Sequence, residues 1–196
     1  TVGMKKLLSI TVLVIVAVLL IFIMKRSEPT LAPTFPQSYH DPLELFSFQY
    51  PDGYTLDTTH AYGMNPNVTI AGVKIQIPAS LATGTNLSAD TYLSVEHLPL
   101  TSECTAERFL DGITSTTTEV HNGITYSVLT LSGAGAGNRY EETVYATPGA
   151  RSCLAIRYFI HSTVLENYDP GTRTQFDAAA LHTTFDAIRD TLTITK

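Results

Sequence analysis

Hydrophobic residues form one unbroken stretch near the start of the chain and alternate with polar residues over most of the remainder. The stretch runs from Leu7 to Met24, LLSITVLVIVAVLLIFIM, and its 18 positions contain no charged residue. An α-helix of this length measures roughly 27 Å, close to the hydrocarbon thickness of a bilayer. The pattern therefore predicts a membrane-spanning helix over residues 7–24.

Two kinds of targeting segment begin with such a stretch, the cleaved signal peptide and the retained anchor. A cleaved signal has an apolar region of about 7–15 residues, followed by small residues at the cleavage point. Here the apolar region is longer, and bulky Ile23 and Met24 precede the cations Lys25 and Arg26. We therefore expect residues 1–26 to act as an uncleaved signal-anchor in the lipid bilayer.

Prolines mark a linker between the anchor and the rest of the chain. Pro29, Pro33 and Pro36 all fall within residues 27–39, and this density of proline favours an extended, semi-rigid spacer. The remaining residues, 40–196, are enough for one domain with its own hydrophobic core.

Alternation with a period of two predicts that this domain consists mainly of strands. Pro51-Asp52-Gly53 supplies turn chemistry between the first two strands, and Ala71-Gly72 favours a bulge in the third. The predicted strands cover residues 45–50, 54–56, 68–77, 91–98, 123–131, 138–146, 151–160 and 192–195.

Two segments break the period of two and predict helices. Residues 105–112 resemble a short helix with Phe109 and Leu110 facing inward. Apolar residues recur at helical spacing over residues 174–191, and Asp177 is placed to cap the start of that helix. Helices packed on a mostly antiparallel sheet give an α+β fold.

Several segments, in this order, are similar to the PsbP-like fold family. They read FSFQYPDGYTL, ITYSVLTLSG, NRYEETVYAT, CLAIRYFIHS and FDAIRDTLTIT, within residues 44–196. That family includes an extrinsic subunit of photosystem II, a Ran-binding nuclear transport factor and anchored bacterial proteins. The resemblance implies an antiparallel sheet packed between helices. The chain departs from the family at Tyr54, where tryptophan is common, and the resemblance assigns no functional residue.

Charge divides the chain into a basic beginning and an acidic remainder. The first 26 residues contain four basic residues and no acidic one, whereas the rest contains eight basic and 18 acidic residues, a formal charge of −10. An acidic surface repels phosphate groups. This excludes nucleic acid as an expected partner and leaves residues 7–24 as the expected contact with the bilayer.

The chain has two cysteines, Cys104 and Cys153, and both follow the anchor. They are either a disulfide, which persists in an oxidising compartment, or two buried free thiols. The two ends of the anchor carry two cations each, so charge alone does not set its orientation. We expect the disulfide, with the N-terminus in the cytoplasm and the domain outside it.

Motifs that carry known chemistry are absent from the sequence. It contains no G-x-S-x-G, S-x-x-K, H-E-x-x-H or C-x-x-C pattern. The glycine-rich segment 133–137 lacks the Lys-Ser/Thr of a phosphate-binding loop, so we expect a flexible hairpin connection there. No cofactor is indicated.

One polar cluster deserves a structural test, namely His161, Asp169 and Asp177. A strand end, a turn and a helix start would bring these three side chains together as a metal or ligand site. The alternative is a solvated loop, in which Asp169 belongs to a turn and Asp177 caps a helix. We favour the solvated loop.

Two classes of function follow from these observations. The first is a membrane-tethered, extracytoplasmic binding or assembly module with a protein partner in the cell envelope. The second is an extracytoplasmic enzyme, hydrolase-like, or a metal-binding protein with its site near His161, Asp169 and Asp177. The tether, the family resemblance and the lack of a nucleophile-base pattern favour the first class.

Overall fold

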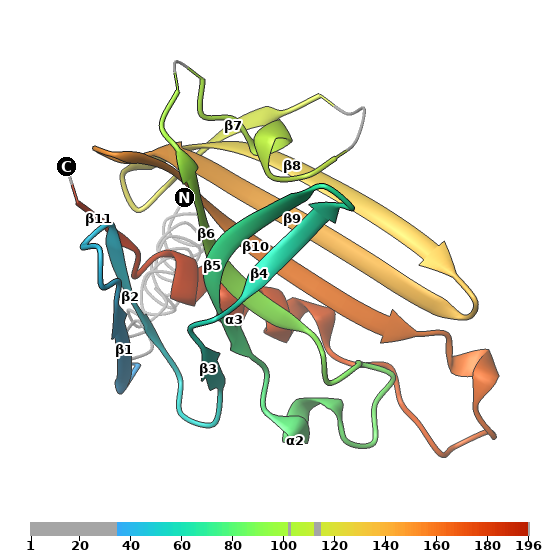
Figure 1. Cartoon of the computed structure of the whole chain (residues 1–196). Coiled ribbons are helices and arrows are strands. Elements are labelled where there is room, and N and C mark those ends of the chain that lie inside the picture. The colour runs from blue at the N-terminus through green and yellow to red at the C-terminus, as the bar shows by residue number, and fades with distance from the viewer. Residues whose placement is uncertain (1–34, 102, 112–114, 196) are drawn as a thin grey trace, which may run out of the picture. The chain divides into compact units, whose positions relative to one another are not determined.

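A large antiparallel sheet with one long helix behind it dominates the computed structural model, which describes residues 35–101, 103–111 and 115–195 (Figure 1). The predicted anchor at residues 7–24 and residues 27–34 of the predicted linker lie outside the described residues. Within the described ranges, none of the helices has the length and apolarity needed to cross a bilayer.

The strands form two antiparallel sheets. The smaller sheet has the order β1-β2-β11, and the larger has the order β3-β5-β6-β10-β9-β8-β7, with β4 paired to β5 outside this path. The strand bounds are β1 (Gln37–His40), β2 (Phe46–Tyr50), β3 (Thr55–Asp57), β4 (Ala61–Asn65), β5 (Val68–Gln76), β6 (Tyr92–Pro99), β7 (Thr117–His121), β8 (Ile124–Gly135), β9 (Asn138–Pro148), β10 (Ser152–Thr163) and β11 (Thr193–Ile194).

Helices are few and mostly short: α2 (Ala79–Ala82), α3 (Ala178–Arg189) and the 3-10 helices η1 (Ala106–Arg108) and η2 (Leu165–Asn167). The Asp177 carboxylate caps α3 as predicted, because it accepts a hydrogen bond from the Ala180 N–H at 2.9 Å. The helix begins later than predicted, since the preceding residues bond to the loop at 84–86. Phe176 N, for example, donates to Asn86 Oδ1 at 3.0 Å.

The main core lies between the larger sheet, the smaller sheet and α3. Apolar positions of α3 recur on one face of the helix and are buried, among them Leu181, Phe185 and Ile188. Phe185 meets Tyr158 of β10 with ring centroids 5.2 Å apart. On the other side, Phe46 and Phe48 of β2 complete the same hydrophobic cluster.

The opposite face of the larger sheet, which we call the front face, is covered differently. Figure 1 shows β4 and the η1 segment in front of the sheet, with α3 behind it. Ile70, Phe109, Leu129 and Cys153 form a smaller core on this side. The α+β class and the antiparallel sheet were predicted correctly, but the sheet does not pack between helices, because a strand and a 3-10 turn take that place in front.

Three local predictions differ from the structure. Residues 37–39, assigned to the linker, belong to β1, which pairs from Gln37 to His40 with β2. The predicted helix over 105–112 is only the turn η1, although Phe109 and Leu110 are buried as expected. Gly133 and Gly135, assigned to a flexible connection, continue β8, so that the turn itself contains only residues 136–137.

No bulge forms at the predicted place, Ala71-Gly72, where the register of β5 with β6 is regular. There β5 passes from pairing with β4 at Ala71 to pairing with β6 at Gly72. A Cβ atom on Gly72 would lie 2.6 Å from the Val95 carbonyl oxygen, so glycine permits a close approach of the two strands. The irregularity in register lies instead in β4, between Gly63 and Asn65.

Candidate functional site: the front face of the sheet

A row of aromatic rings crosses the part of the front face that β4 leaves open. Phe159 of β10 stacks on Tyr92 of β6 at 4.9 Å and lies 6.1 Å from Tyr140 of β9. Tyr140 in turn stacks on His161 at 4.4 Å. The row follows from the register, because Phe159 is opposite Tyr92 and His161 is opposite Tyr140. Tyr140 is 36% exposed, the most accessible ring of the row.

His161 is fixed at the end of this row by hydrogen bonds on both sides of its ring. Its Nδ1 lies 2.8 Å from Asp90 Oδ1, and its Nε2 lies 2.9 Å from Asn138 Oδ1. A histidine held at both nitrogens and stacked on a tyrosine is a rigid part of the surface. Its contacts therefore orient Tyr140, which is the group that a ligand or a partner can reach.

A buried charged network lies beside the aromatic row and is built on Arg157 of β10. The Arg157 side chain is fully buried and forms a bidentate pair with Glu96 of β6, at 2.8 Å from Nε and 2.9 Å from Nη2. Its Nη1 donates to Glu142 of β9 at 2.7 Å, and Nη2 also donates to the Phe109 carbonyl at 2.6 Å. Tyr62 of β4 covers the guanidinium, whose carbon lies 3.4 Å from the ring centroid.

Electrostatics keep the guanidinium of Arg157 charged. Burial works to lower the pKa of Arg157, but the hydrogen bonds and charge of Glu96 outweigh it, so the pKa is raised above its ordinary value. For Tyr62, burial disfavours the charged form and raises the pKa to about 12. The Tyr62 hydroxyl donates a hydrogen bond to Glu142 at 2.9 Å. One cation and two carboxylates thus meet in the core, with all three tied to different strands.

His60 lies at the edge of the network. Its Nε2 is buried without a hydrogen-bond partner in the described residues and lies 4.0 Å from Glu96 Oε1. Burial lowers the pKa of His60, although the nearby Glu96 carboxylate opposes this. The ring is therefore held in its neutral form, and it forms an edge contact with Tyr92 at 5.1 Å.

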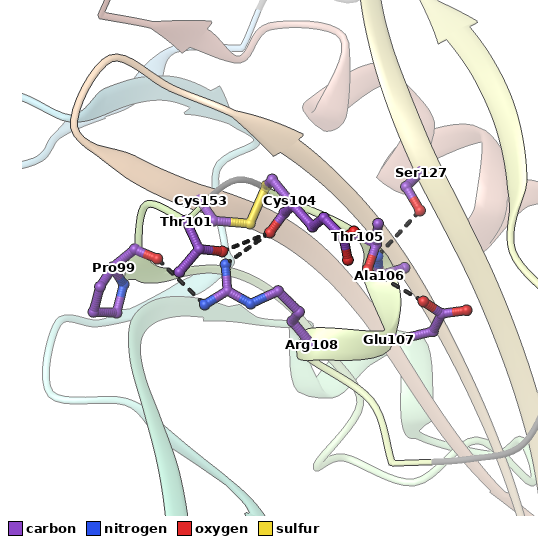
Figure 2. The surroundings of a disulfide bond; sticks show 10 residues. Pro99, Thr101, Cys104, Thr105, Ala106, Glu107, Arg108, Ser127 and Cys153 are labelled. Carbon is purple, nitrogen blue, oxygen red and sulfur yellow. Dashed lines mark hydrogen bonds between the residues drawn. A yellow bond between two sulfur atoms is a disulfide. The ribbon is translucent and has the colours of Figure 1, made fainter.

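The disulfide holds the front segment that completes the network. Cys104 and Cys153 are joined, which confirms the predicted bond. Figure 2 shows the segment around it, where Arg108 donates to the Pro99 carbonyl at 3.3 Å and Ala106 N donates to Ser127 Oγ at 3.1 Å. Because Phe109 follows η1 directly, these contacts place its carbonyl against Arg157.

His161, Asp169 and Asp177, the three residues considered as a possible site, have separate contacts, as expected for the solvated loop that we favoured. His161 pairs with Asp90, and Asp177 caps α3. Asp169 lies in a turn, where its carbonyl accepts from Thr172 N at 3.1 Å. Among the residues that the structure describes, no group of three or more His, Cys, Asp or Glu side chains has an arrangement that could hold a metal ion.

Sequence reasoning missed the buried network. The signal that could have revealed it is a charged residue at an inward position of a hydrophobic strand, as in CLAIRYFI around Arg157 and YLSVEHL around Glu96. A charge at such a position requires a buried partner, but the sequence does not say which partner.

Comparisons with known proteins bear on the fold. No protein-family model matches the chain, and no curated protein matches it. A crystal structure of a protein from Bacteroides thetaiotaomicron is similar with a TM-score of 0.51 at 9% identity, covering 83% of this chain and 50% of that one. The chain thus spans half the length of that protein, and a likeness at this identity shows the fold alone.

The second similar structure is the solution structure of PsbP from the cyanobacterium Synechocystis. It is 17% identical, with a TM-score of 0.45, and the match covers 87% of this chain and 98% of that one. A TM-score of this size carries no argument about function.

Proposed function

We propose that the chain is a membrane-tethered, extracytoplasmic module that binds or assembles with another protein through the front face of its sheet. The observation that carries this proposal is the exposed ring of Tyr140, held in place by His161 and Phe159. Tyrosine is enriched at protein interfaces because it buries a large apolar area at little conformational cost while keeping a polar end.

The setting of the domain supports the same proposal. The apolar segment 7–24 provides the tether, and the prolines of residues 27–39 provide the spacing from the bilayer. The Cys104–Cys153 disulfide is of the kind that persists outside the cytoplasm. A tethered domain also meets membrane-bound partners at a raised effective concentration, which compensates for a small binding surface.

The enzyme and metal-site alternative gains no support from the geometry. The three side chains on which it depends have separate structural roles, in an ion pair, in a turn and in a helix cap. The charged side chains that the core does gather, Arg157 and Glu96, are fully buried and bonded to each other. They have no open side on which a substrate would react.

Photo-crosslinking tests the proposal. A photoreactive phenylalanine derivative replaces Tyr140 in the full chain, in membranes of cells that make it, and the same residue replaces Leu81 of α2 as a control. Leu81 is 42% exposed and lies on a different element. We expect a discrete adduct from position 140 that is missing from position 81. No adduct at 140, or the same adducts from both positions, contradicts the proposal.

A further inference from the structure

The far half of β8 is a sheet edge without a neighbour among the described residues. Strand β7 pairs with β8 only from Ile124 to Val128, and the residues Leu129–Gly135 continue beyond it. On its other side β8 stays paired with β9 in an unbroken register from Ser127 to Gly135. The edge is therefore straight and regular, and one side of it is open.

The hairpin geometry identifies the backbone groups that face outward. Ala136 and Gly137 form the two-residue turn, both with positive φ (49° and 79°), as a type I′ turn requires. In such a hairpin the flanking pair Gly135 and Asn138 exchanges hydrogen bonds, and every second pair does the same. The N–H and C=O groups of Thr130, Ser132 and Ala134 consequently point away from β9, toward the open side.

Proteins usually protect such an edge, and the described ranges 35–101, 103–111 and 115–195 show no protection of this one. The common devices are charged side chains, proline, a bulge or a covering segment. Between Leu129 and Gly135 the sequence LTLSGAG contains no charge and no proline. Thr130, Ser132 and Ala134 are all exposed.

Nothing in the local structure requires glycine at two positions of this strand. Gly133 and Gly135 do not have positive φ, and a Cβ atom on either would meet nothing within 4 Å. Glycine weakens a strand and often marks a place where another backbone or ligand approaches closely. Gly133 is opposite Tyr140, so its missing side chain leaves a path over the sheet to that ring.

The back of the same edge offers a second place for side chains. A pocket of about 530 Å³ lies there, lined among others by Ser132, Ala134, Arg139, Glu141 and Ile160. A strand added to β8 would direct alternate side chains over Gly133 toward Tyr140 and into this pocket. Backbone bonding would provide affinity, and these two places would provide specificity.

We propose that β8 binds an extended segment of another protein by strand addition, and that this segment is basic. The proposal rests on the proposed function as a binding module. Two features select positive charge: the formal charge of −10 on the chain after residue 26, and the ring of Tyr140 as a surface for a cation. The Glu141 carboxylate in the pocket adds no free charge, because it lies 3.1 Å from His182 Nε2 and Arg139 lines the same pocket. A second copy of this acidic domain would be repelled instead.

Strand addition is tested by combining substitutions in β8 with the photoreactive residue at position 140 of the full chain. Ser132→Pro removes one outward N–H without removing a β8–β9 hydrogen bond, and we expect the adduct to fall roughly tenfold. Ser132→Ala is the matched control and should leave it unchanged. Ala134→Lys should lower the yield by repulsion, whereas Ala134→Glu, of similar length, should retain it. Mass spectrometry should find a segment with net positive charge in the adduct.

Several outcomes overturn the proposal of a basic segment added to β8 while leaving the binding module intact. These are an adduct that persists in Ser132→Pro and Ala134→Lys, a crosslinked segment that is acidic, and a covalent dimer of the 21.3 kDa chain. Thermal unfolding of each variant shows whether it has folded. If Ser132→Pro does not fold, the adduct yields of Ala134→Lys and Ala134→Glu still test the proposal. The absence of any adduct at position 140, by contrast, contradicts the proposed function itself.

Discussion

Arg157 shows how one buried charge organises the front of this protein. A guanidinium that is removed from water loses several kcal/mol of hydration, which only close and complete bonding offsets. Here its bonding partners come from β6, β9 and the segment after η1, and the ring of Tyr62 adds β4. Each of these elements is therefore held at the position where it completes the coordination of one side chain.

Removing the cation should be costly, because Glu96 would stay buried without a partner. We expect Arg157→Met to lower the free energy of unfolding by about 3–5 kcal/mol, measured by urea denaturation. Glu142→Gln is the milder control, since the Glu142 side chain is 19% exposed and retains access to water. The double variant Arg157→Met, Glu96→Gln should recover part of the loss. A loss in Arg157→Met no larger than in Glu142→Gln would contradict this role.

His60 should make the stability depend on pH in a defined direction. Its pKa is lowered in the folded state by burial, so the unfolded chain binds the proton more readily. Stability from this group is therefore present above the ordinary pKa of about 6.5 and is lost as pH falls below it. Tm recorded between pH 8 and pH 5 should fall less in His60→Gln than in the unaltered chain. Equal pH profiles would show that His60 does not contribute.

At the scale of the elements, alternation of apolar residues decided which strands were predictable. The long strands β5, β8 and β9 have at least one face in a core, whereas β6 and β10 are buried on both faces over most of their length. Each was predicted within a few residues of its bounds, from alternation or from its β-branched and aromatic residues. Strands β1, β4 and β7 were missed, because most of their side chains are exposed or half-buried and leave no period of two. Helix α3 was found because its apolar positions recur at helical spacing.

The candidate site was much less predictable than the strands. Arg157 and Glu96 are 61 residues apart, and they meet only because β10 and β6 pair in one particular register. His161 was singled out as a residue at a strand end, but the partners considered for it, and not favoured, came from the following turn and helix start. Its real partners, Asp90 and Asn138, lie before β6 and at the start of β9. Pairing between strands distant in sequence determined the site, and the sequence does not show that pairing.

For the molecule as a whole, the distribution of charge and the pairing of the cysteines are both consistent with the extracytoplasmic location that we propose. The four basic residues of the first 26 are beside the apolar segment 7–24, and the acidic excess belongs to the residues that follow. On the membrane tether and spacer that we propose, an acidic domain would be repelled by anionic lipid headgroups, which would leave the front face available to partners. The disulfide joins residues 49 apart in the sequence and links the front segment to the central strand β10.

The last prediction concerns this bond, which connects the stability of the domain to its compartment. Cys104→Ser should lower the free energy of unfolding by roughly 2–5 kcal/mol, because the unfolded chain regains the freedom of an open loop. The control is the unaltered chain unfolded with reductant, which should show a similar loss. In protein isolated from membranes and denatured, we expect thiols to react only after reduction. Two thiols that react without reductant would contradict both the bond in the cell and the extracytoplasmic location that we propose.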